Sequence, residues 1–204
     1  MFFLGHMVWG YIFGRISASA LKIRVNIPLL LFVAILPDLD IYLSELGITH
    51  RTVTHSILFW LPISIVFLVV FRLSVVPYIV SIIQHIVFGD FIVNVTPWFW
   101  PWKSMFGLGF DLFSMVNIAI ETLGLILFVT YSYTNSDLRL ILSKEKGTLF
   151  SLLPILSLIL LPFLYIVTQE FVFSSELLIV GFLHLSLTLL FLPSLFNGLK
   201  RSIK

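Results

Sequence analysis

Long apolar runs separated by short polar stretches set the pattern of this chain. Apolar segments occur at about residues 2–20, 27–36, 54–71, 75–95, 112–133, 149–168 and 175–197. About 20 apolar residues span the hydrocarbon core of a bilayer as a helix, so most of these segments are transmembrane candidates. The segment at 27–36 is short and ends at Pro37, which suits a helix that opens onto a protein-lined cavity. The pattern predicts an all-α, polytopic transmembrane bundle of about seven helices, the first two being candidates for short or re-entrant helices.

Composition agrees with this pattern. The chain has 204 residues, of which 59% are hydrophobic and only 11% are charged, and its mean hydropathy is +1.11. About a quarter of the residues of a soluble domain are charged, so this chain has too little polar surface for one. No repeat or linker divides the sequence, and we expect a single membrane domain over residues 1–204. Its motifs lie in residues 1–105, whereas residues 106–204 carry apolar segments without a recognised motif.

The distribution of charge predicts the orientation. If all seven segments cross the membrane, ten of the twelve basic residues fall on one side: Arg15, Lys22, Arg24, Arg72, Arg139, Lys144, Lys146, Lys200, Arg201 and Lys204. Because basic residues accumulate on the cytoplasmic side, we expect an integral protein of the cell membrane with its N-terminus outside and its C-terminus in the cytoplasm. The bilayer is then the main partner, and a net charge of +2 does not indicate nucleic acid.

The scarce polar residues gather at the predicted outer face. They come from four separate stretches within the first 90 residues: His6, Asp38, Asp40, His50, Arg51, His55, His85 and Asp90. Each stretch alone has a simpler explanation as a solvated turn or an interfacial residue. Their convergence at one face of the membrane is hard to explain by chance, and it indicates a functional site.

The residue types in this set favour a divalent metal. The chain has no cysteine, so thiolate sites are excluded, and imidazole with carboxylate suits one or two ions of Zn²⁺ or Mn²⁺. In the stretch LPDLD, Asp38 and Asp40 would point the same way if the chain were extended after the proline. Such a pair could hold one cation or bridge two.

The stretch HRTVTH, residues 50–55, combines histidines with a potential anion site. Thr54 or Ser56 could cap a helix that begins near His55. The free N–H groups at a helix start suit a phosphate or carboxylate. Arg51 would add a bidentate donor for the same anion.

Other polar and aromatic residues have alternative interpretations. An interfacial aromatic belt accounts for three tryptophans, Trp98, Trp100 and Trp102. His184 is interpreted as a structural, hydrogen-bonded histidine, and Asp111 as a helix N-cap. Glu121 lies inside an apolar segment with Asn117 one turn before it, and both a functional role and a buried hydrogen-bonding role remain open for it.

The order of motifs resembles a known family. GH near the start, LPDLD, HRTVTHS, QH with a nearby Asp, and then WP are similar to the membrane-bound metal-dependent hydrolases, the YdjM-like proteins, some of which are LexA-regulated in bacteria. The resemblance covers about residues 1–105. It implies a helical membrane protein with a metal site formed by residues that match the motifs: His6, Asp38, Asp40, His50, His55 and His85, with Arg51 in the same block. A more distant similarity to zinc phospholipase C and P1-type nucleases implies a phosphoester substrate, such as a lipid or lipid-linked phosphate.

One position departs from the family pattern. The family shows His-x-x-x-Asp here, whereas HIVFGD places Gly89 at the expected position and Asp90 one residue later. On a regular α-helix Asp90 would lie about 140° from His85 rather than about 40°. A π-bulge near Gly89 would restore the alignment, and without it Asp90 is not a ligand.

These observations favour a membrane-embedded, metal-dependent hydrolase that acts on a phosphoester at the extracytoplasmic face. The metal would activate water, Arg51 would hold the phosphate, and Asp40 or Asp90 would act as general base. The alternative is a non-enzymatic, metal-stabilised membrane scaffold or lipid-binding protein. A closed shell of protein ligands would favour the scaffold, and an open position would favour catalysis. A transporter is less well supported because the polar residues lie at one face rather than along a path.

Overall fold

The computed structural model describes residues 1–46, 49–142 and 175–202, and this part of the chain has helices and no strand beyond one isolated bridge between Thr96 and Phe106. The predicted all-α class is therefore confirmed. Two helical stretches, Ile57–Val93 and Met115–Thr134, are long and apolar enough to cross a membrane. They coincide with the apolar segments predicted at 54–71, 75–95 and 112–133. The segment predicted at 149–168 lies outside the described residues, so the count of seven crossings stays a prediction.

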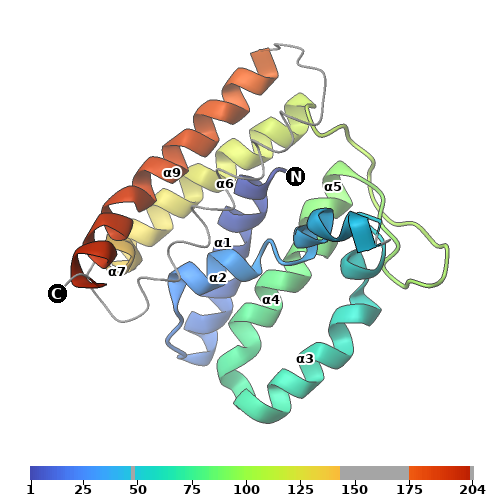
Figure 1. Ribbon diagram of the computed structural model, residues 1–204, viewed down its shortest axis with the longest axis horizontal. Helices are drawn as coiled ribbons and strands as arrows, with labels where there is room; N and C mark the ends of the chain where they lie inside the picture. Colours follow the sequence, from blue (N-terminus) through green and yellow to red (C-terminus); the bar gives the residue numbers. More distant parts are fainter. Residues whose placement is uncertain (47–48, 143–174, 203–204) are drawn as a thin grey trace.

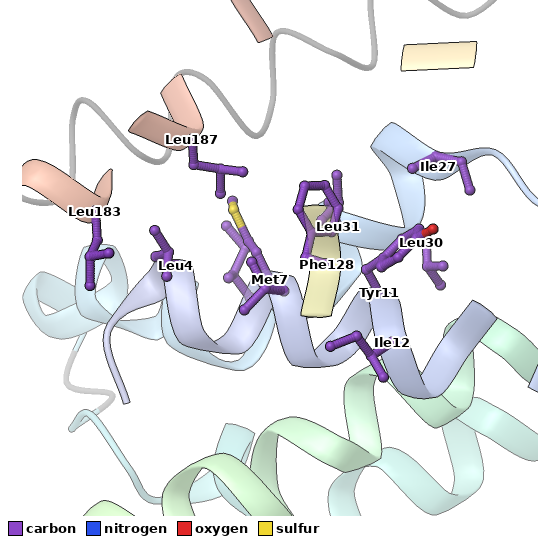
Figure 2. Close-up of a cluster of buried hydrophobic side chains, with 12 residues drawn as sticks. Leu4, Met7, Tyr11, Ile12, Ile27, Leu30, Leu31, Phe128, Leu183 and Leu187 are labelled. Carbon is purple, nitrogen blue, oxygen red and sulfur yellow. The ribbon is translucent and has the colours of Figure 1, made fainter. Parts of the chain in front are cut away.

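Helix α1 (Phe3–Leu21) occupies the centre of the fold. It lies between α4 (Val76–Gln84) on one side and α6 (Met115–Thr134) with α9 (Ser175–Ser202) on the other (Figure 1). The hydrophobic core forms around it from side chains of α1, α2, α6 and α9, including Leu4, Met7, Tyr11, Leu31, Phe128, Leu183 and Leu187 (Figure 2). The buried side chains of this core come from all four helices. Packing against α1 therefore fixes the positions of α2, α6 and α9.

Both ends of α1 are held by the second half of the chain. The N-cap residue of α1 provides no side-chain cap, and the backbone N–H of Phe2 donates instead to Glu121 Oε1 of α6 at 2.6 Å. Toward the other end, Arg15 Nε donates to Asp137 Oδ2 at 2.6 Å and the Tyr11 hydroxyl donates to the same oxygen at 2.8 Å. Asp137 begins α7 (Asp137–Leu142). Glu121 therefore has the hydrogen-bonding role of the two considered for it.

The segment after α1 turns back toward the start of α1. Helix α2 (Ile27–Val33) begins at Asn26, whose side chain accepts from the N–H of Leu29 at 2.9 Å. Leu30 packs against Gly14 of α1, and Ala34, just after α2, packs against Gly10. The later residue thus contacts the earlier glycine, so α2 runs antiparallel to α1. With seven residues, α2 is about 10 Å long. A continuous helix over 27–36 was expected, but the helix ends at Val33, which makes it too short to cross a bilayer alone.

A 3-10 helix, η1 (Pro37–Leu46), follows and carries the two aspartates. This corrects the expectation of extended chain after Pro37. Because a 3-10 helix has three residues per turn, positions i and i+2 point in different directions. Asp38 and Asp40 consequently have different neighbours, described below.

Helices α3 (Ile57–Phe71) and α4 form the two arms of a hairpin joined by the 3-10 turn η3 (Arg72–Val75) (Figure 1). Apolar side chains cover the outer surface of α3; Val69, for example, is 76% exposed, as expected for a helix that faces lipid. Helix α4 continues through a π-helical turn, η4 (His85–Asp90), into α5 (Phe91–Val93). The hairpin thus returns the chain to the end at which α3 began, where the backbone N–H of Ile57 donates to the Trp98 carbonyl at 2.8 Å.

The close packing of α1 against α2 and α4 predicts a steric effect at Gly10. A Cβ at this position would lie 2.4 Å from Ala34 Cβ and 2.7 Å from Ser81 Oγ. We expect Gly10→Ala to destabilise the protein by about 1–3 kcal/mol, measured as a lower midpoint of thermal unfolding in detergent. Gly181→Ala in α9 is the control, because a Cβ there meets no described atom within 4 Å, and it should be neutral or stabilising by up to about 1 kcal/mol. Equal effects of the two substitutions would contradict this packing.

Candidate metal centre

The eight polar residues predicted to converge lie at one end of the bundle. His6 is in the second turn of α1, and Asp38 and Asp40 begin η1. His50 and Arg51 precede the short 3-10 helix η2 (Val53–His55), while His85 and Asp90 are the two ends of η4. Figure 1 shows the start of α1, the end of α4 and the segment between α2 and α3 at this same end.

Four of these residues bring ligand atoms together, because the Nε2 atoms of two histidines each lie near one oxygen of each of two aspartates. His55 Nε2 lies 3.2 Å from Asp38 Oδ1, 3.3 Å from Asp90 Oδ2 and 3.4 Å from His85 Nε2. His85 Nε2 lies 3.4 Å from the same two oxygens. We call these four atoms the inner set. The residues that carry them are 0–5% exposed.

The spacing of the inner set matches tetrahedral metal coordination. Zinc binds nitrogen and oxygen ligands at about 2.0–2.1 Å, and ligands at tetrahedral corners are then about 3.3–3.4 Å apart. Five of the six distances in the inner set are given by the structure, and they fall between 3.2 and 3.4 Å. These five distances, each of which involves a histidine, are compatible with a divalent ion held by the four side chains.

In both histidines of the inner set, the Nδ1 atom, which faces away from the other inner-set atoms, has a polar neighbour that orients the ring. His85 Nδ1 donates to the Ala34 carbonyl at 2.7 Å, which leaves the lone pair on Nε2. His55 Nδ1 lies 3.4 Å from Asp40 Oδ2 and 3.1 Å from the Thr54 hydroxyl. A carboxylate or carbonyl behind a histidine is the usual arrangement around protein metal ions, because it fixes the tautomer and the ring orientation.

Asp40 lies one layer outside the inner set. One oxygen accepts from His50 Nδ1 at 2.6 Å, and the other accepts from the Thr54 hydroxyl and from the Arg51 backbone N–H at 3.2 Å. Burial alone would raise the pKa of Asp40, but the hydrogen bonds from His50, His55 and Thr54 outweigh it and hold the pKa well below its usual range. Asp40 is therefore a charged hydrogen-bond acceptor that ties HRTVTH to η1.

His50 occupies the edge of the cluster. Its side chain is 30% exposed, and its ring lies 5.0 Å from that of His55 in an edge-on arrangement. Its ligand atom is still within 4.8 Å of ligand atoms of Asp38 and His55. Of the predicted ligand set, Asp38, His55 and His85 join Asp90 in the inner set. His6 lies beside the other oxygens of the two aspartates, and His50 contacts Asp40 at the edge of the cluster.

The π-helical turn brings Asp90 into the inner set. It spans His85–Asp90, and it is the departure from α-helical geometry that Asp90 would need in order to lie beside His85. Gly89 within it lies against His6, because a Cβ there would be 2.4 Å from His6 Cε1. The missing side chain allows the His6 ring to stack on that of His85, with centroids 3.6 Å apart and 15° between planes. The extra residue in HIVFGD thus brings Asp90 beside His85, and the glycine within it leaves space for the His6 ring.

Several buried polar atoms of the cluster lack a hydrogen bond. Among the described residues, both ring nitrogens of His6 and both carboxylate oxygens of Asp90 are buried without a hydrogen-bond partner. Burial of such atoms without a partner costs roughly 1–3 kcal/mol each, and more for a charged group. A bound cation would satisfy the Asp90 oxygens and one ring nitrogen of His6, while the other ring nitrogen would still need an acceptor.

The start of α3 does not form the predicted anion site. The Thr54 hydroxyl donates to Asp40, and Ser56, although at the N-cap, donates through Oγ to the Trp98 carbonyl at 2.9 Å. The Ile57 N–H donates to that same carbonyl, so a backbone acceptor already occupies the helix start. Arg51 Nε is buried and has no hydrogen-bond partner in the described part of the chain.

The remaining predictions concern residues outside the cluster. Asp111 accepts from the N–H of Phe113 at 2.7 Å, and Ser114 rather than Asp111 caps α6. His184 Nδ1 donates to the Val180 carbonyl at 2.8 Å, in agreement with a structural role. Trp100 and Trp102 are 43% and 64% exposed, whereas the ring of Trp98 stacks on Phe106.

Comparison with known proteins identifies the family. A model of the family described as YdjM inner membrane protein matches residues 1–171, so the chain belongs to this family. The match extends beyond residues 1–105 into the part without recognised motifs. No curated protein and no solved structure matches the chain significantly.

The layer behind the inner set predicts a graded effect on metal affinity. Asp40→Asn should weaken zinc binding by about 10–100-fold with unchanged stoichiometry, because His55 loses its carboxylate partner. His85→Ala should abolish high-affinity binding, because it removes one of the four inner ligands. Competition titration against a chromophoric chelator measures both, with His184→Ala as the control. An Asp40→Asn protein with wild-type affinity would contradict the orienting role.

Proposed function

We propose that this YdjM-family protein is a membrane-embedded, metal-dependent hydrolase that cleaves a phosphoester of a lipid or lipid-linked substrate at the extracytoplasmic face. The observation that carries the proposal is the inner set: four buried nitrogen and oxygen atoms, 3.2–3.4 Å apart in every given pair. Nitrogen and oxygen donors at this spacing suit zinc, and manganese accepts the same donors. When bound, the ion would polarise a phosphoryl oxygen and lower the pKa of a water molecule, which would be a fifth ligand because the inner set supplies four.

His55, His85, Asp38 and Asp90 would hold the ion, and Asp40 would orient His55. Two carboxylates were candidates for the general base, and Asp40 is the weaker one because its oxygens already accept from His50, Thr54 and Arg51. Asp90 Oδ1 faces His6 at 3.8 Å and has no hydrogen bond within the described residues. The side of the cluster that faces His6 is therefore the side on which we place the reaction.

Arg51 would bind the phosphate. Its backbone N–H is fixed on Asp40 at 3.2 Å, and its φ of 61° is held there despite the steric cost of this region for a non-glycine residue. A buried guanidinium nitrogen without a partner favours an anion, and arginine recognises phosphate oxygens with two parallel donors.

The surroundings of the cluster support a lipid substrate. The Trp98 carbonyl, which holds the start of α3 beside His55, belongs to the loop that carries the exposed Trp100 and Trp102. Exposed tryptophans favour the boundary between headgroups and acyl chains. The phosphate of a membrane lipid would lie at this depth, near the candidate site.

The orientation rests on charge. Lys22 is 16 residues after His6, about 24 Å along α1, and Arg72 lies in η3 at the far end of the α3–α4 hairpin. The positive-inside rule then places His6 and the cluster outside and the far end in the cytoplasm. We propose about seven crossings, with α2 and the turn after it forming a broken second one.

A non-enzymatic metal-braced scaffold is the second candidate. Four protein ligands around one ion form a closed shell, which is typical of structural zinc. In that case a chelator would lower the unfolding midpoint, and no phosphoester would be hydrolysed at any metal loading. Turnover that depends on His55, measured with His55→Ala in folded protein, would exclude the scaffold as the whole function.

Hydrolysis by protein in nanodiscs tests the proposal. With zinc present, lipid phosphates should be cleaved in preference to soluble phosphoesters. Arg51→Gln should lower kcat/KM by about 10²–10³-fold, because a charged donor to the transition state is lost, while metal content stays unchanged. Lys103→Gln, which removes the other basic residue expected on this face, should change kcat/KM less than about twofold. Wild-type activity in Arg51→Gln would refute the phosphate-binding role.

A further inference from the structure

The two aspartates of the inner set use only one oxygen each within it. Asp38 Oδ1 and Asp90 Oδ2 face His55 and His85 at 3.2–3.4 Å. The other oxygens, Asp38 Oδ2 and Asp90 Oδ1, each lie 3.8 Å from His6 Nε2. The cluster therefore has a second side, formed by one imidazole nitrogen and two carboxylate oxygens that the inner set leaves free.

A hydrogen-bonded ion pair does not account for His6. Both of its ring nitrogens are buried and lack a hydrogen bond within the described residues, and 3.8 Å is too long for a hydrogen bond to either aspartate. Its ring also stacks face to face on that of His85, with centroids 3.6 Å apart. Nε2 therefore lies beside two carboxylate oxygens without a hydrogen bond, an arrangement that a bound cation would satisfy.

The spacing on this second side fits a metal ion. With ligand bonds of about 2.1 Å, a separation of 3.8 Å between ligand atoms corresponds to an angle of about 130° at the metal. This angle is wider than tetrahedral, as for a site with few protein ligands. Each of the two carboxylates has one oxygen on the side of the inner set and one on the side of His6. Carboxylates in this arrangement can bridge two ions about 3.5–4 Å apart, as in two-metal phosphoesterases.

We propose that His6 Nε2, Asp38 Oδ2 and Asp90 Oδ1 form a second divalent-metal position, bridged to the first through Asp38 and Asp90. This inference rests on the proposed function and sharpens it, because three protein ligands leave the second position open, whereas four close the first. It makes Asp90 a bridging ligand in place of a general base. It also gives a reason for Gly89, whose missing Cβ leaves room for the His6 ring.

Metal stoichiometry tests this position independently of activity. Full-length protein, freed of metal and reconstituted with excess Mn²⁺ in nanodiscs, should retain two ions per chain after desalting. Its electron paramagnetic resonance spectrum should show magnetic coupling between neighbouring ions. His6→Ala should retain one ion and give the uncoupled signal of an isolated Mn²⁺. His184→Ala is the control and should keep two coupled ions, because His184 donates to the Val180 carbonyl and lies outside the cluster.

Gly89→Ala provides a second variant, which removes no proposed ligand residue. Its Cβ would collide with the His6 ring at 2.4–2.5 Å, so the ring must move and the variant should also lose one ion. This result is informative even if His6→Ala fails to fold. One ion in the wild type, or two coupled ions in both His6→Ala and Gly89→Ala, would overturn the second position.

Failure of this inference and failure of the proposed function give different results. Two coupled ions without hydrolysis of any phosphoester would support the second position and reject the hydrolase. Metal-dependent hydrolysis by a wild-type protein that holds a single ion would support the hydrolase and reject the second position.

Discussion

The burial of carboxylates and imidazoles at one end of a helix bundle is the constraint on which the rest of the structure depends. Asp38 and Asp90 are 5% and 0% exposed, and three histidines packed around them, His6, His55 and His85, are each 0% exposed. Two ionised carboxylates that face the same histidines repel each other where the dielectric is low. A divalent cation would supply the positive charge that such a group needs, and its binding would then be coupled to the stability of this end of the bundle.

The four residues of the inner set lie in short irregular elements, which connect or extend the long helices. The 3-10 helix η1 sends Asp38 into the cluster and Asp40 behind it. The π-helical turn η4 moves Asp90 onto the same side as His85. Departures from α-helical geometry are often found at functional sites, because they re-aim side chains that a regular helix would separate.

The second half of the chain carries no ligand in the described residues, yet it holds the helix that does. Glu121 of α6 accepts the first free N–H before α1, and Asp137 of α7 binds Arg15 and Tyr11 farther along. These contacts prevent α1 from sliding along its axis, and they therefore fix the position of His6 relative to the other residues of the cluster. The family match extends over residues 1–171, beyond the motifs of the first half.

The sequence by itself determined the all-helical membrane class and the residues that gather at one end, because apolar periodicity and the scarcity of polar groups are local properties. The identity of His6, Asp38, His55 and His85 as one cluster followed from this, and HIVFGD marked where a π-turn was needed. Only the tertiary structure decided which aspartate faces the cluster and which supports it, and that Trp98 occupies the start of α3. Those outcomes depend on the 3-10 geometry of η1 and on contacts between residues 42 positions apart, neither of which is encoded in local spacing.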